Sequence, residues 1–232
     1  MVKTWNDFDW FLYHERWEEQ YNDMTKAGYK HIVENFSVVD DELIIDDNVH
    51  ENAKEIYCDI YRLKPRSVFE AGCGAGHHLI NIKKTSPWVE VAGCDRNQKQ
   101  LALGKRLFST PDEIYNKLAA HNLVDAPYPG KYDFIFTNAV TMHIPQEDAI
   151  KFLKNVASMA TKYVLLIENY TLQYYEEIIP TCFPEFQSGL LYDDNGASNP
   201  HSLRGDSPAK VKHGIGEYCG KWNSIWFLER MT

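Results

Sequence analysis

An acidic residue followed by three alternating glycines is the part of this sequence best suited to bind a ligand. The segment Ser67–Gly76 reads Ser-Val-Phe-Glu-Ala-Gly-Cys-Gly-Ala-Gly, with a carboxylate at Glu70 and glycines at Gly72, Gly74 and Gly76. An apolar run that ends in a glycine-rich turn predicts a buried strand, a tight turn and the start of a helix. Glycine lets the backbone approach a ligand closely, and the first N–H groups of the helix point at whatever lies above the turn. We call residues 72–76 the glycine turn.

The carboxylate before the glycine turn indicates the charge of the ligand. A dinucleotide-binding turn reads G-x-G-x-x-G and places a pyrophosphate at the helix N-terminus. Here His77 occupies the place of the last glycine of that pattern. Glu70, two residues before the first glycine, would repel a phosphate and attract a cation. We therefore expect a ligand that is positively charged near Glu70.

Strands and helices alternate between residues 66 and 170. The predicted strands are Val68–Glu70, Val89–Asp95, Lys117–Asn122, Tyr132–Asn138 and Tyr163–Glu168, and the predicted helices are His77–Lys84, Gln98–Phe108 and Gln146–Ala160. Continuous apolar strands separated by helices predict a three-layer α/β sandwich with a mostly parallel, doubly wound sheet. Ligands of such sheets bind at the carboxyl ends of the strands, where Glu70, Asp95 and Asn138 would lie. Glu168 ends at the same edge, and we expect it to be a solvated strand end.

Two regions flank this alternation. In the first, apolar or aromatic residues at positions 10, 13, 17 and 21 predict one helical face, which either packs on the main domain or covers a pocket as a lid. A second helix is expected from about Glu51 to Arg62, and the acidic residues around Leu43–Ile45 predict a loop. After residue 170 we expect a helix over about Leu172–Ile179 that ends at Pro180, a loop over 184–216, and a final strand at Trp222–Glu229.

The composition excludes several classes of protein. The formal net charge of −9 opposes non-specific binding to nucleic acid. Five scattered cysteines without a C-x-x-C pair predict neither a zinc cluster nor a disulfide framework, and no metal is expected. The sequence has no signal peptide pattern and no apolar stretch long enough for a membrane span, so we expect a cytoplasmic protein without membrane association.

The chain resembles the class I, Rossmann-like S-adenosylmethionine-dependent methyltransferases. The first motif of that family matches Glu70 through Gly76 at every fixed position, and its second motif is an acidic residue that closes the next strand, as Asp95 does. The segment Tyr132–Phe136 and the following Asn138–Pro145 look like the fourth-strand region of the family. The resemblance covers about residues 66–170.

This resemblance implies S-adenosylmethionine as the cofactor. The glycine turn would pack against its methionine part and ribose, and Glu70 would help to hold its amino group. Asp95 would accept hydrogen bonds from the ribose hydroxyls; taken alone, it could instead cap the helix that starts near Asn97. Arg96 would flank the adenine. The cofactor-binding residues expected in this way are Glu70, Gly72, Cys73, Gly74, Gly76, Asp95, Arg96, Asn122 and Asn138.

The contact to the adenine amino group departs from the family pattern. The family often has an aspartate after the third strand, whereas the matching region here is Ala120–Asp125. His121, Asn122 and Asp125 compete for the role, and we favour Asn122. Asp125 also begins a segment that resembles the D-P-P-Y box of DNA amino-methyltransferases. That segment precedes the fourth strand instead of following it, which argues against nucleic-acid methylation.

The expected function is methyl transfer to a small or medium-sized acceptor with an oxygen, nitrogen or carbon nucleophile. The domain that performs it would be residues 65–232, preceded by an N-terminal helical cap at residues 1–64. His143 is the catalytic candidate, because a neutral imidazole after the fourth strand could accept a proton or orient the acceptor; the alternative is a pocket wall. The rival functions are a non-catalytic cofactor-binding or regulatory protein and a nucleotide-linked oxidoreductase. The sequence leaves the acceptor and the oligomeric state open.

Overall fold

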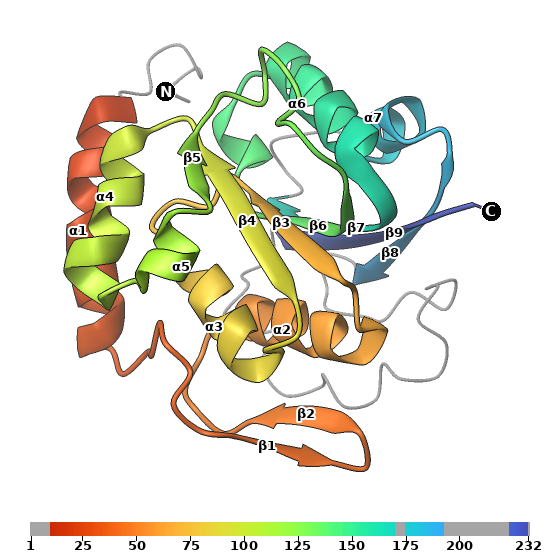
Figure 1. The fold of residues 1–232 in the computed structure, drawn as a ribbon. Coiled ribbons are helices and arrows are strands. Elements are labelled where there is room, and N and C mark those ends of the chain that lie inside the picture. The colour runs from red at the N-terminus through yellow and green to blue at the C-terminus, as the bar shows by residue number, and fades with distance from the viewer. Residues whose placement is uncertain (1–9, 170–174, 193–222, 232) are drawn as a thin grey trace.

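A mixed sheet of seven strands forms the centre of the molecule (Figure 1). The computed structural model describes residues 10–169, 175–192 and 223–231. In spatial order the strands are β5 (Leu118–Ala120), β4 (Glu90–Asp95), β3 (Ser67–Ala71), β6 (Tyr132–Asn138), β7 (Ala160–Asn169), β9 (Asn223–Arg230) and β8 (Phe186–Tyr192). The first five are parallel, and β9 runs antiparallel to both of its neighbours. The expected doubly wound α/β architecture is confirmed, including the short third strand at β5.

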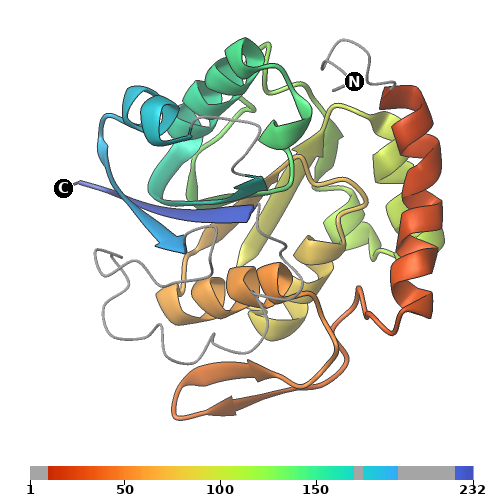
Figure 2. The ribbon, with the colours of Figure 1, turned by 180° about the vertical axis from the view of Figure 1, so that it is seen from behind.

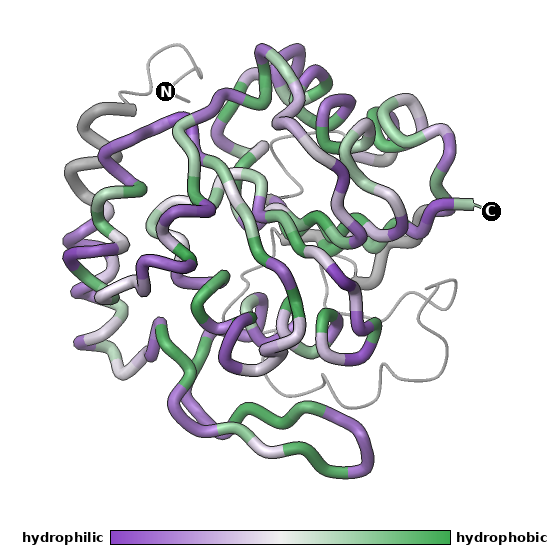
Figure 3. The backbone as a smooth tube through the Cα atoms, viewed as in Figure 1, coloured by the Kyte–Doolittle hydropathy of each residue, from purple (hydrophilic) through white to green (hydrophobic). Residues whose placement is uncertain are grey.

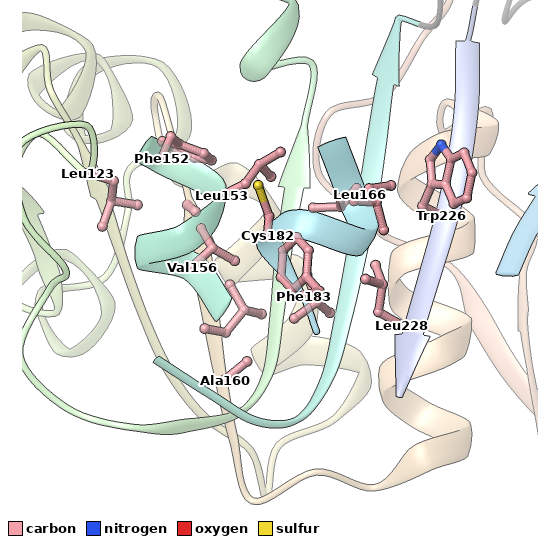
Figure 4. Close-up of a cluster of buried hydrophobic side chains, with 14 of the residues drawn as sticks. Leu123, Phe152, Leu153, Val156, Ala160, Leu166, Cys182, Phe183, Trp226 and Leu228 are labelled. Atoms are coloured by element: carbon pink, nitrogen blue, oxygen red, sulfur yellow. The ribbon is translucent and has the colours of Figure 1, made fainter. Parts of the chain in front are cut away.

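Two helical layers cover the sheet, because successive strand residues point to opposite faces. Val68, Phe134 and Phe136 pack beneath α2 (Glu51–Leu63) and α3 (His77–Thr85). Phe69 and Ile135, their neighbours in sequence, pack beneath α6 (Gln146–Met159) and α7 (Tyr175–Cys182). Figure 4 shows this second core, where residues of β7 and β9 face residues of α6 and α7. Each central strand is therefore apolar on both faces.

The N-terminal region packs against helices of the α/β domain. Helix α1 (Trp10–Lys26) lies beside α4 (Gln98–Phe108), as both views show (Figures 1 and 2), and the Glu18 carboxylate accepts a hydrogen bond from Arg106 Nη2 at 2.6 Å. A short helix, α5 (Asp112–Tyr115), precedes β5. The expected helices in this region are confirmed for α1 and α2.

The predicted acidic loop between those helices is wrong. Residues 36–45 form a β-hairpin of β1 (Phe36–Val39) and β2 (Glu42–Ile45). Asp40 and Asp41 make its two-residue turn with φ of 52° and 63°, the left-handed values that a type I′ turn requires. Figure 3 shows hydrophobic stretches on both strands of this hairpin. On β2, Leu43 and Ile45 are buried against α2, whereas Ile44 between them is exposed. The acidic residues mark the turn of the hairpin.

Two predictions for the C-terminal region also need correction. Pro180 lies inside α7 and does not end it, because Ile178, Ile179 and Cys182 are buried in the second core and this packing extends the helix past the proline. Strand β8 occupies part of the predicted loop 184–216, and the remainder, from residue 193, lies outside the described residues. The predicted final strand is confirmed as β9. None of the helices in the described part of the chain is long and apolar enough to span a lipid bilayer.

Candidate functional site

A cavity of about 430 Å³ opens at the carboxyl ends of β3, β4 and β6. Glu70, Asp95 and Asn138 contribute to its lining from these three strands. Residues from α1 through the start of α3 form another wall of the cavity. We call this the N-terminal wall, and its polar and aromatic members include Trp17, Tyr21, Tyr29, His31, His50, Tyr57, His77 and His78.

The glycine turn has a backbone that only glycine adopts easily. Gly72, Gly74 and Gly76 have φ of 80°, 51° and 74°. A Cβ atom on Gly72 would also lie 2.5 Å from Val140 Cγ2, well inside van der Waals contact. The turn is therefore closely packed against the residues that follow β6.

Hydrogen bonds fix the glycine turn to the next strand. The backbone N–H groups of Gly72 and Cys73 both donate to the carbonyl oxygen of Cys94, at 2.8 and 2.9 Å. Burial raises the pKa of the Cys73 and Cys94 thiols, so both remain protonated. Both cysteines are buried and line the cavity.

Asp95 connects the glycine turn with the start of α4. Its Oδ2 accepts a hydrogen bond from Gly74 N at 3.0 Å, and its Oδ1 accepts one from Asn97 N at 2.8 Å. The N-cap of α4 is Asn97, whose own side chain accepts from Lys99 N. Burial raises the pKa of Asp95, and the two backbone hydrogen bonds oppose that shift. Since each carboxylate oxygen can accept more than one hydrogen bond, both can still accept from a ligand.

Glu70 has an unsatisfied carboxylate oxygen at the cavity. Its side chain is 2% exposed, and its Oε2 atom has no hydrogen-bond partner within the described residues. Burial raises the pKa of Glu70 well above its ordinary value, and the charge of Asp95 raises it further. A buried polar atom without a partner is costly, and a cation beside it would remove that cost. Glu70 therefore favours a cationic group near the glycine turn.

The residues expected to contact the adenine lie next to Asp95, at Arg96, and in the loop after β5. Arg96, His121 and Asn122 all line the cavity, whereas Asp125 lines a neighbouring cavity of about 420 Å³. Asn122 Oδ1 accepts from Val124 N at 3.2 Å, and Asn122 Nδ2 donates to the Asp125 carboxylate at 2.9 Å. The side chain of Asn122 therefore shapes this loop and also borders the cavity.

Asn138 begins a buried hydrogen-bonded chain that reaches the N-terminal wall. Asn138 Nδ2 donates to His78 Nε2 at 3.2 Å, and His78 Nδ1 lies 2.7 Å from the Tyr57 hydroxyl. Asn81 Nδ2 donates to the same hydroxyl at 2.8 Å, and Asn81 Oδ1 accepts from Val33 N at 2.9 Å. Burial lowers the pKa of His78 to about 3, so this imidazole is neutral. His78 therefore packs in the interior at the start of α3.

A second group of aromatic rings is centred on Tyr21 of the N-terminal wall. The Tyr21 ring lies edge-on to the rings of His31, His77 and Phe108, with centroids 4.7, 5.6 and 5.2 Å away. Burial lowers the pKa of His31 and lowers that of His77 well below its ordinary value. This wall is therefore polar and aromatic, and its histidines are neutral at pH 7.

His143 lies at the rim of the cavity. It ends a short 3₁₀ helix, η2 (Thr141–His143), is half-buried, and lines both cavities. Gly76 is the one predicted binding residue that the cavity lining omits; it supports α3, and a Cβ on it would lie 2.8 Å from Leu118 Cδ1. The other predicted site residues are brought together around the main cavity. In the described part of the chain, no group of three or more His, Cys, Asp or Glu residues could hold a metal ion.

Glu168 is not the solvated strand end that we predicted. Its side chain is 1% exposed, and its carboxylate accepts hydrogen bonds from Val140 N at 3.0 Å and Met142 N at 3.3 Å. The prediction was wrong because the chain after β6 folds back over the end of β7 and covers it. The available signal was the same one that identified Asp95, an acidic residue that closes an apolar strand.

Comparisons with known proteins agree with this geometry. A family model described as a methyltransferase domain matches residues 68–162. The uncharacterized protein RP028 of Rickettsia prowazekii (strain Madrid E) is 28% identical over 93 residues, which are 40% of this chain and 37% of that protein. The match therefore spans little more than a third of the length of this relative.

Solved structures share the fold at low sequence identity. The magnesium protoporphyrin IX methyltransferase of Synechocystis PCC 6803, with bound S-adenosylmethionine, matches with a TM-score of 0.54 and 16% identity, over 78% of this chain and 79% of that one. The O-methyltransferase from a trans-AT PKS multienzyme of Brevibacillus brevis, in complex with S-adenosylhomocysteine, matches with a TM-score of 0.56 and 16% identity, over 78% and 72%. Residues 68–162 therefore match a methyltransferase-domain model, and the chain shares the Rossmann-like fold of these methyltransferase structures.

Proposed function

We propose that this protein is an S-adenosylmethionine-dependent methyltransferase that acts on a small or medium-sized acceptor through an oxygen, nitrogen or carbon nucleophile. The observation that carries the proposal is the buried, unpartnered Oε2 atom of Glu70 beside the glycine turn. An oxygen in this position suits a cation and opposes a pyrophosphate. S-adenosylmethionine carries both an ammonium group and a sulfonium group.

The residues around the cavity fit this cofactor. Glu70 would hold the amino group, and the glycine turn would lie against the methionine part and the ribose. Asp95 would accept hydrogen bonds from the ribose hydroxyls with the capacity that its two backbone bonds leave. Arg96 and Asn122 would border the adenine, and Asn138 would face the cofactor from the end of β6.

When bound, the cofactor supplies an electrophilic methyl group on a sulfonium sulfur. The protein has to align the acceptor with that group and to exclude water. The N-terminal wall contributes neutral imidazoles and phenols, which can hydrogen-bond a polar acceptor without charge. His143, at the rim, is the proposed residue to orient the acceptor or to accept its proton.

The two solved structures named above are a magnesium protoporphyrin IX methyltransferase and an O-methyltransferase from a trans-AT PKS multienzyme, so the shared fold does not fix the acceptor. We propose a small-molecule acceptor and no nucleic-acid partner, in line with the net charge of −9. We further propose that residues 1–64 act as a cap on a cofactor-binding domain at 65–232, and that the protein works in the cytoplasm.

Two measurements on the purified protein test the proposal. Calorimetric titration with S-adenosylmethionine is expected to show one binding site per chain. Incubation with S-adenosylmethionine and a panel of phenols, carboxylic acids, amines and carbon acids is expected to release S-adenosylhomocysteine with at least one compound. Absence of binding at millimolar cofactor contradicts the proposal, and binding without turnover on any acceptor favours a non-catalytic protein of the same fold.

A further inference from the structure

We propose that Glu168 is a positioning residue of the methyl-transfer site, which holds the chain after β6 in the conformation that forms one wall of the cavity. This chain, residues 139–143, is called the β6 turn below. The inference rests on the proposed function for its catalytic consequence. The claim that one buried carboxylate controls the conformation of the β6 turn depends only on the contacts described below, whatever the function.

The Glu168 carboxylate binds the β6 turn through backbone N–H groups. Val140 N lies 3.2 Å from Oε1 and 3.0 Å from Oε2, and Met142 N lies 3.3 Å from Oε2. Val140 is the N-cap of η2 and Met142 lies in its first turn, where backbone N–H groups have no partner within the helix. Hydrogen bonds from N–H groups to a carboxylate are stronger than bonds between neutral groups, and removal of the acceptor leaves buried donors unsatisfied.

The β6 turn needs such support because its backbone is strained. Ala139 has a φ of 57°, a left-handed value that a residue with a side chain adopts at a cost. Its N–H group donates to Ile167 O at 2.8 Å, one residue before Glu168. The end of β7 therefore binds the β6 turn at two successive residues. Without these bonds, relaxation of Ala139 would move the turn.

The β6 turn touches both halves of the site. Val140 is the residue against which Gly72 packs, with no room for a Cβ between them. Val140, Met142 and His143 all line the cavity, and His143 also borders the neighbouring cavity. Displacement of the turn would shift the wall that faces the acceptor and the support of the glycine turn together.

A buried pair of hydroxyl groups closes the turn from the other side. Thr141 Oγ1 lies 2.5 Å from the Tyr175 hydroxyl, and both residues are fully buried. Burial raises the pKa of Glu168 and of Tyr175, so the phenol stays protonated at neutral pH. The β6 turn is thus fixed between the end of β7 and the first residue of α7.

The test uses Glu168→Gln, which keeps the size of the side chain but replaces one acceptor oxygen with an NH₂ donor. Amide hydrogen exchange of the ligand-free protein is followed for the β6 turn and for the adjacent strands β6 and β7. We expect exchange at Val140 and Met142 to rise at least tenfold while exchange within the strands is unchanged. Glu90→Gln, an exposed carboxylate at the start of β4, is the matched control and should change neither.

Two further readouts separate positioning from general stability. The affinity for S-adenosylhomocysteine should fall by a smaller factor than the rate of methyl transfer in Glu168→Gln, because the glycine turn keeps its hydrogen bonds to Cys94 and Asp95. The rate of methyl transfer to the acceptor identified in the panel, at saturating cofactor, should fall more than tenfold.

Equal acceleration of exchange in the turn and in the strands would mean a purely structural role and would overturn the proposal. So would unchanged exchange at Val140 and Met142, or an unchanged rate in a variant with faster exchange. If the wild-type protein transfers no methyl group but the exchange result holds, the proposed function fails and the control of the turn stands.

Discussion

The two ends of the cavity differ in the kind of polar group that they bury. At the glycine turn, Glu70 and Asp95 are carboxylates with raised pKa values. At the N-terminal wall, His31, His77 and His78 have lowered pKa values and are neutral. Burial is the first cause of the shift in all five groups, because it disfavours the charged form of each. The difference indicates which end of the cavity a charged ligand would stabilise.

A cationic ligand would stabilise the glycine-turn end more than the N-terminal wall. An ammonium group beside Glu70 would satisfy the buried oxygen and favour the carboxylate form. At the N-terminal wall, the Tyr57 hydroxyl and both ring nitrogens of His78 are already hydrogen-bonded within the protein, through the chain from Asn138 to Asn81. Substitutions at the first end should therefore change cofactor affinity, and substitutions at the second should mainly change stability.

The largest expected effect is that of Asp95→Ala. Loss of the ribose contacts and of the hydrogen bond from Gly74 should weaken S-adenosylhomocysteine binding on the order of a hundredfold, since hydrogen bonds to charged groups contribute about 1.5–3 kcal/mol each. Calorimetry measures the affinity, and circular dichroism should show an intact fold. Asp112→Ala, at an exposed position outside the cavity, is the control. An unchanged affinity in Asp95→Ala would refute the ribose assignment.

The next largest effect is expected for Gly72→Ala, and a comparison with Gly28→Ala distinguishes backbone strain from a steric clash at the cavity. Gly72→Ala and Gly28→Ala both introduce a Cβ at positive φ, 80° and 93°. Only the first brings that Cβ against Val140, since at Gly28 the nearest atom is 3.5 Å away. Both variants should lose about 1–2 kcal/mol of unfolding free energy from strain. Gly72→Ala should lose more, and it alone should bind S-adenosylhomocysteine at least tenfold more weakly. Equal affinities for S-adenosylhomocysteine in the two variants would mean that the glycine turn does not contribute to cofactor binding.

A smaller, graded effect concerns pH. In the ligand-free protein the pKa of Glu70 is raised, so its contribution to stability is full below the ordinary value of 4.5 and is lost as pH rises through the raised pKa. A cationic ligand favours the ionised form, so affinity should increase with pH across the same window, by at most tenfold per unit for one proton. Calorimetry from pH 5 to pH 8 measures this dependence. Glu70→Gln should flatten it, and a wild-type slope retained in that variant would assign the dependence to another group.

The smallest expected effect on affinity is that of Tyr57→Phe at the N-terminal wall. The Tyr57 hydroxyl pairs with His78 and Asn81, so its removal should cost about 1–2 kcal/mol of unfolding free energy. Affinity for S-adenosylhomocysteine should change less than threefold. Tyr61→Phe, on the same helix and half-buried, should change neither quantity. A tenfold loss of affinity in Tyr57→Phe would mean that both ends of the cavity hold the cofactor.

The glycine-turn end could be predicted from sequence because its signals are local. Glu70, the glycines and Asp95 lie close together along the chain, and each ends or follows a strand with a clear apolar pattern. The order of helices and strands between residues 66 and 170 followed from the same pattern. Parallel strand ends then bring these residues to one edge of the sheet.

The other parts depended on contacts between distant segments. The link from Asn138 through His78 and Tyr57 joins three elements, and no spacing in the sequence indicates it. The burial of Glu168 depends on how the β6 turn folds back over it. The hairpin at residues 36–45 differs from the predicted loop because Asp40 and Asp41 suit both structures, and turn residues between apolar runs also predict a hairpin.

The central claim is that the glycine turn and its two carboxylates bind an adenosyl amino acid and not a pyrophosphate. Calorimetric titration of the wild-type protein with S-adenosylhomocysteine and, separately, with NADH at neutral pH tests it directly. Both ligands carry adenosine, but only the first places an ammonium group, and no phosphate, beyond the ribose. We predict one site for S-adenosylhomocysteine and no detectable heat of binding for NADH. Binding of NADH with no binding of S-adenosylhomocysteine would contradict the account and would favour a nucleotide-linked oxidoreductase.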